Sequence, residues 1–190
     1  MRRTDRGFSI GLSADERSLL RSIAAHLRDE IRTIADPSEP VPDELRRLLP
    51  TAYPTDAVAQ AEFEESQRRE TIDHQARALE ILEQTAGAEE LTDEAASAWL
   101  DALVELRLVY GTALGVEETW EEPDANDPQY GEWLAYAYLT YITSELVDAL
   151  STTLPPYDGS ADEHAPDDPW GEPPGDLRWD GTPLPPDEPA

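Results

Sequence analysis

Proline is distributed so unevenly that it divides the chain in two. Ten of the 17 prolines lie in residues 151–190, where ten acidic residues accompany a single arginine, Arg178. Proline interrupts both helices and strands. A segment with this much charge also buries too little apolar surface to offset the loss of chain entropy on folding. We therefore predict a helical domain over residues 1–150 and a disordered, acidic, proline-rich tail over residues 151–190.

Apolar residues in the first 150 positions have the spacing of helices. They recur every three or four positions in residues 14–34, 57–86, 92–114 and 128–150, as expected for helices with one buried face. A shorter helix is expected between the prolines at 40 and 50, and alternating apolar residues at 8, 10 and 12 predict a short extended segment. The predicted fold class is all-α: about five helices in a bundle with a short N-terminal extended segment.

Several helix ends carry capping signals. Ser13 and Glu16 have the spacing of a capping box at the start of the first helix. Gly87 and Gly115 are expected to end two of the later helices, because glycine readily adopts the left-handed conformation that closes a helix. Asp127, which a proline follows, predicts the N-cap of the last helix.

Two of these regions are expected to bury broad apolar faces. The helix over residues 57–86 presents Val58 among its apolar positions, and the last helix presents Leu134 and Tyr141 among its aromatic and aliphatic ones. Because exposing such faces to water is unfavourable, we expect these residues to face the core.

The inventory of side chains excludes several chemistries. The chain has no lysine and no cysteine, which excludes Schiff bases, thiol nucleophiles, disulfides and thiolate metal sites. His26, His74 and His164 lie far apart, and neither helical histidine has the Glu-x-x-His spacing of metal-binding bundles. We predict no catalytic residue, no cofactor and no metal site, and we do not expect an enzyme.

The net charge restricts the partners. At pH 7 the chain carries a formal charge of −28, which disfavours contact with the phosphates of nucleic acids. Arginines cluster at residues 2–6, 46–47 and 68–69, but acidic residues flank each cluster, and ion pairs within helices are the simpler interpretation. No segment has the length and apolarity of a signal peptide or a membrane span. We expect a cytoplasmic protein with a protein partner.

The most apolar run, LVELRLVYGTALGV at residues 103–116, contains an arginine and a glycine one helical turn apart. Arg107 would need a carboxylate or carbonyl partner in such a run, so a structural ion pair and a partner-binding role are the two interpretations. Gly111 costs about 1 kcal/mol of helix propensity relative to alanine, which indicates the close approach of another helix. The aromatic helix over residues 133–150 is our candidate.

The tail contains two further candidates for partner binding. Trp170 and Trp179 lie among acidic residues and prolines, with a minimal P-x-x-P pattern shortly after them. Aromatic side chains in a disordered acidic segment have no core to join, and they can dock into a groove of a partner.

The order of motifs resembles a known family. LLPTAYPTD at residues 48–56 precedes the block WLDALVELRLVYGTALGV at 99–116, and a closing helix with Tyr130 and Trp133 follows. Over residues 6–150 the chain is similar to an actinobacterial family, domain of unknown function twenty-seventeen, also called the oxidative stress regulator family. The resemblance implies a helical, non-enzymatic, redox-responsive transcriptional regulator that acts with a sigma factor. Its gene often lies beside that of the Clp protease adaptor.

One difference from this family changes the functional prediction. The redox response attributed to the family depends on a cysteine pair, which this chain lacks, so cysteine-based sensing does not carry over. The predicted function is a regulatory protein that acts through protein partners in transcriptional or stress regulation. The alternatives are a direct DNA-binding regulator and an accessory protein in Clp-type proteolysis.

Overall fold

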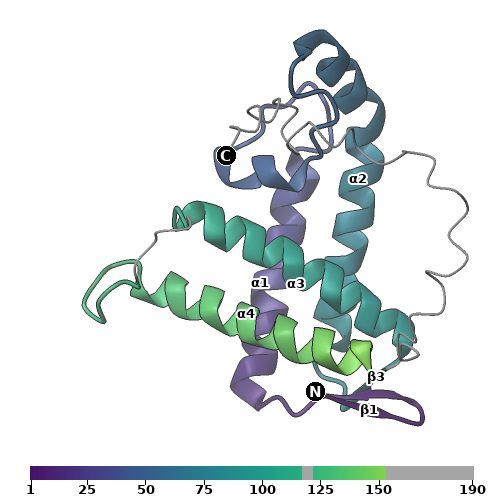
Figure 1. The fold of residues 1–190 in the computed structure, drawn as a ribbon, viewed down its shortest axis with the longest axis vertical. Helices are drawn as coiled ribbons and strands as arrows, with labels where there is room; N and C mark the ends of the chain where they lie inside the picture. Colours follow the sequence, from purple (N-terminus) through teal and green to yellow (C-terminus); the bar gives the residue numbers. More distant parts are fainter. Residues whose placement is uncertain (117–121, 153–190) are drawn as a thin grey trace, which may run out of the picture. The chain divides into compact units, whose positions relative to one another are not determined.

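The computed structural model describes residues 1–116 and 122–152, which form five helices and a three-stranded sheet (Figure 1). The predicted all-α fold with an extended N-terminal segment is confirmed. Trp170, Trp179 and the other residues of the predicted tail from 153 onward lie outside the described residues, whereas Ser151 still belongs to the last helix. In chain order the elements are β1 (Arg2–Thr4), β2 (Gly7–Ser9), α1 (Ala14–Thr33), the 3-10 helix η1 (Asp43–Leu48), α2 (Ala57–Thr85), β3 (Glu90–Leu91), α3 (Asp93–Ala113) and α4 (Tyr130–Ser151).

The extended segment is the central strand of the sheet. β2 pairs antiparallel with β1 on one side and with β3 on the other. Phe8 of β2 is fully buried opposite Leu91 of β3. Gly7 has a φ of +141°, and a Cβ at this position would lie 1.9 Å from the carbonyl oxygen of Leu91. Only glycine tolerates both this conformation and this close approach.

The four α-helices bury one continuous core. In Figure 1, α1 and α2 run side by side, and α3 and α4 cross them. The largest fully buried side chain is that of Trp99 on α3, whose indole N–H donates a hydrogen bond to the hydroxyl of Thr85 on α2 over 2.7 Å. Leu79 of α2 and Leu103 of α3 are fully buried in the same core. None of the described helices is long and apolar enough to cross a membrane.

Two of the predicted helix ends have the expected geometry. Ser13 and Glu16 form the reciprocal capping box of α1, with N···O distances of 3.2 and 2.7 Å. α3 ends in a Schellman motif, in which Gly115 has a φ of +64°. The Val116 N–H bonds to the carbonyl of Gly111 over 2.8 Å, and the Gly115 N–H bonds to that of Thr112. Local sequence therefore set both of these boundaries.

Two other predicted boundaries were wrong. α2 ends at an Ala86 cap in the right-handed conformation, and Gly87 does not have a positive φ. α4 begins at Tyr130 rather than directly after Asp127. The Asp127 carboxylate instead accepts a hydrogen bond of 2.8 Å from the N–H of Gln129 and caps the turn before the helix.

Three residues expected in the core face solvent instead. Val58, Leu134 and Tyr141 are 70, 47 and 58% exposed. Val58 lies in the first turn of α2, and α4 packs mainly against α3. Since α4 has one principal neighbour, only one side of its broad apolar face can be covered.

An arginine that the sequence gave no reason to single out ties the end of α2 to the N-terminal segment. The guanidinium of Arg17 on α1 donates hydrogen bonds to the carbonyls of Ile10, Leu12, Ala86 and Ala88. The carbonyls of Ala86 and Ala88 lie 69 and 71 residues from Arg17 in sequence. Such charge-assisted bonds stabilise the junction between the two segments.

Candidate functional site

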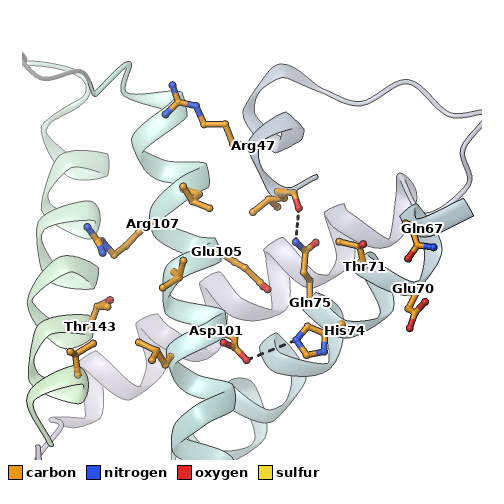
Figure 2. Close-up of a pocket in the computed structure, with 15 residues that line it drawn as sticks. Arg47, Gln67, Glu70, Thr71, His74, Gln75, Asp101, Glu105, Arg107 and Thr143 are labelled. Carbon is orange, nitrogen blue, oxygen red and sulfur yellow. Dashed lines mark hydrogen bonds and ion pairs between the residues drawn. The ribbon is translucent and has the colours of Figure 1, made fainter. Parts of the chain in front are cut away.

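A groove of about 870 Å³ opens between η1, α2, α3 and α4 (Figure 2). Its apolar lining includes Val104 and Leu108 of α3 and Val147 of α4, which are 40, 37 and 44% exposed. Charged side chains also line it: Arg47 and Arg107 on one side, and Glu70, His74 and Asp101 on the other.

The helical repeat of α3 explains why these residues share the groove. Asp101, Val104, Glu105 and Leu108 recur every three or four positions, so they form one stripe along the helix. Leu103 belongs to the neighbouring stripe, which is buried in the core. One face of α3 therefore holds the fold together, and the adjacent face is left to the groove.

Glu105 is the most unusual residue of the groove. It is 7% exposed, and its Oε2 atom is buried without a hydrogen-bond partner among the described residues. Burial, with a smaller contribution from the charge of Asp101, raises the pKa of Glu105 to about 8. At neutral pH its carboxyl group therefore holds a proton. Figure 2 shows the side chain extending from α3 toward α2.

Gln75 lies on α2 on the side of the groove toward which Glu105 extends (Figure 2). Its amide N–H donates to the carbonyl of Leu48 over 2.7 Å, which ties η1 to α2. Its Oε1 atom is buried and, within the described part of the chain, has no partner. Nearby, Nε2 of His74 on α2 lies 3.9 Å from Oδ2 of Asp101 on α3, and both side chains are largely exposed. Counting only described residues as possible donors, two buried oxygens without a donor therefore line this groove.

Arg107, the residue predicted to bind a partner, lines the same groove. Its Nε donates to the hydroxyl of Thr140 on α4 over 3.2 Å. No carboxylate in the described ranges lies within ion-pair distance of it, so the expected structural ion pair is not found there. The partner-binding role of Arg107 stays a prediction.

A residue of another helix lies close to Gly111, as the glycine in the middle of α3 predicted. A Cβ at this position would lie 3.2 Å from the ring of Tyr136 on α4. The glycine therefore allows the aromatic helix to approach α3, as predicted. Gly111, Tyr136 and Arg107 also line a smaller cavity of about 160 Å³ beside the main groove.

The arginine clusters are engaged in ion pairs, but only those at residues 46–47 and 68–69 pair within their own helix as predicted, whereas the N-terminal cluster pairs with residues about 85–90 positions along the chain. Arg68 is buried and donates to the carbonyl of Glu39 as well as to a carboxylate. Each cluster contributes at least one pair: Arg3–Asp93, Arg6–Glu90, Arg46–Asp43 and Arg68–Glu64. These pairs reduce the positive charge that the clusters could offer to phosphates.

Sequence reasoning missed Glu105 and Gln75. One signal could have found Glu105, because it lies two positions before Arg107 in the most apolar run of the chain. Gln75 carries no comparable signal, since glutamine is common on exposed helix faces. Among the described residues, no group of three or more histidine and acidic side chains is placed to hold a metal ion.

Comparison with known families identifies the chain at the family level. The model of a domain of unknown function, DUF2017, matches residues 1–150. The chain belongs to this family. The DUF2017 match spans nearly all of the described elements and includes every residue named above as lining the groove. Comparisons with curated proteins and with solved structures found no match.

Proposed function

We propose that this DUF2017 protein is a non-enzymatic regulator that holds a segment of a protein partner in the groove between η1, α2, α3 and α4. The observation that carries the proposal is the exposure of Val104, Leu108 and Val147 along one groove. Exposed apolar side chains that gather in a concave surface favour binding of a partner. A partner helix with apolar residues every three or four positions would match such a lining.

The charges around the groove support a protein rather than a nucleic acid. The chain has a formal charge of −28, and at least one arginine of each cluster is already paired with a carboxylate. The groove itself presents both signs, with Arg47 and Arg107 opposite Glu70 and Asp101. Charges of both signs orient a polypeptide partner, whereas a phosphate backbone requires a uniformly positive surface.

The family resemblance supports a role in the cytoplasm in transcriptional or stress regulation. The actinobacterial oxidative stress regulator family that the sequence resembles acts with a sigma factor, and its gene often lies beside that of the Clp protease adaptor. We propose a transcription component as the partner, with a Clp-type proteolysis component as the alternative. Since the chain has no cysteine, it cannot itself supply the cysteine-based redox response attributed to the family.

A matched pair of variants tests the groove. Val147→Asp places a charge in the groove, and Leu134→Asp places one at an equally exposed position of the same helix outside it. Proteins retained by the wild type in a cell lysate are identified and purified, and their affinity for each variant is measured. We expect at least a tenfold loss for Val147→Asp and little change for Leu134→Asp. Equal affinities for both variants would contradict the proposal.

A second measurement addresses direct DNA binding. Phosphate contacts are strongest at low salt, so an electrophoretic shift with duplex DNA is sought at low ionic strength. We expect no shift. A shift that the Arg47→Gln variant abolishes would instead favour the direct DNA-binding alternative.

A further inference from the structure

We propose that Glu105 and Gln75 form a subsite for a cationic side chain of the partner, an arginine or a lysine. The inference rests on the proposed function, because it names what the floor of that groove recognises. A cation at this place would provide several N–H donors between α2 and α3.

The proposed subsite contains two buried oxygens to which none of the described residues donates. Glu105 and Gln75 are 7 and 9% exposed. Glu105 Oε2 and Gln75 Oε1 are both buried, and neither has a hydrogen-bond partner in the part of the chain that the structure describes. Buried polar atoms are nearly always hydrogen-bonded. The amide N–H₂ of Gln75 donates to the carbonyl of Leu48, so its oxygen is the atom left without a partner.

Cationic side chains offer the donors that these two oxygens need. A guanidinium carries five N–H donors and an ammonium three, and neither has an acceptor. Such a group has enough donors for both the Glu105 carboxylate and the Gln75 oxygen. A deprotonated anion has no donor for the Gln75 oxygen, and the carboxylates of Glu70 and Asp101, which line the same groove, would repel it.

The charges around Glu105 also favour a cation. The charged groups that line the groove around Glu105 are Arg47 from η1, Glu70 and His74 from α2, and Asp101 and Arg107 from α3. Figure 2 shows Glu70, His74 and Asp101 on the side of the groove toward which Glu105 extends, whereas Arg47 and Arg107 lie on the other side. A cation beside Glu105 would therefore lie near two further carboxylates and away from both arginines.

Binding of the cation is coupled to release of the proton from the Glu105 carboxyl group. In the empty groove the raised pKa of Glu105, about 8, keeps its carboxyl group protonated at neutral pH. A cation favours the carboxylate form, so the incoming cation stays charged and the Glu105 proton leaves to solvent. Affinity should then rise by up to about tenfold per pH unit below pH 8 and level off above it, because one proton is released.

The test uses the full-length protein and small probes of one shape. n-Butylguanidinium supplies the cation, and n-butylurea is its neutral counterpart. Affinities are measured by NMR from pH 6.5 to 9 at high salt, which screens exposed carboxylates. The side-chain carboxyl carbon of Glu105 reports its protonation directly. We expect the guanidinium to lower the apparent pKa of Glu105 and to bind more tightly as pH rises, and the urea to do neither.

Two variants complete the test. Glu105→Gln should weaken guanidinium binding at least tenfold and remove its dependence on pH above 7. Glu94→Gln changes an exposed carboxylate of the same helix outside the groove and should bind as the wild type does. Equal binding to wild type and Glu105→Gln, or an unchanged Glu105 resonance in the wild type, would overturn the inference. The proposed function would survive that result if Val147→Asp still abolished partner binding.

Discussion

Replacing Glu105 with glutamine should make the protein more stable, and the gain should grow with pH. Glutamine has nearly the same shape as the protonated glutamic acid and cannot ionise. In the folded chain the pKa of Glu105 is raised from its ordinary value of 4.5 to about 8. The folded chain thus keeps this proton in a pH range where the unfolded chain has released it. The free energy of unfolding of the wild type must therefore fall as pH rises from about 4.5 to about 8, and this contribution is constant outside that window.

The magnitude follows from the same two pKa values. Each pH unit inside the window costs the wild type about 1.4 kcal/mol. Between pH 5 and pH 7 the advantage of Glu105→Gln over the wild type should increase by about 2–3 kcal/mol. Other titrating groups are common to both proteins, so they cancel in the difference.

Urea unfolding followed by circular dichroism at several pH values measures the effect. Glu94→Gln is the matched control, because it removes an exposed carboxylate from the same helix, and its difference from the wild type should not change between pH 6 and pH 8. A Glu105→Gln difference that is equally independent of pH would refute the reasoning. It would mean that the Glu105 carboxyl group is as easily ionised in the fold as in the unfolded chain.

Three further substitutions test other parts of the structure by urea unfolding. Gly7→Ala forces a Cβ against the carbonyl of Leu91 and should lower the free energy of unfolding by at least about 2 kcal/mol. Gly11→Ala should lower it far less, because no atom lies within 4 Å of a Cβ at that position. Arg17→Met removes the donor from four carbonyls and should cost about 2–4 kcal/mol. Arg107→Met loses one hydrogen bond to a hydroxyl and should cost at most about 1 kcal/mol; a much larger loss would restore the ion-pair interpretation.

The errors of the sequence-based prediction share a cause. Val58 and Tyr141 have the spacing of core residues, but the helices offer no neighbour to cover them. Periodicity reports that a helix has an apolar face, but not how much of that face another element covers. β1 and β3 were missed because each has only two or three residues and exists only by pairing with β2.

The candidate site was predicted only in part. Arg107 and Gly111 attracted notice because each is unusual in an apolar helical run, and both lie at the groove or beside it. Glu105 was equally unusual in the same run and was overlooked. Gln75 could not be singled out, because its burial comes from contact with η1, a segment about 27 residues away.

The amino-acid sequence by itself determined the helical class, the capping box at Ser13 and the Schellman motif at Gly115. These features depend on residues at most five positions apart, so local composition and spacing are sufficient to specify them. Tertiary structure alone decided that Glu105 and Gln75 would be buried in one groove, each with an oxygen to which no described residue donates. The raised pKa of Glu105 and the two buried oxygens result from the removal of water when α2, α3 and η1 pack together. Local sequence patterns do not show which segments will pack together.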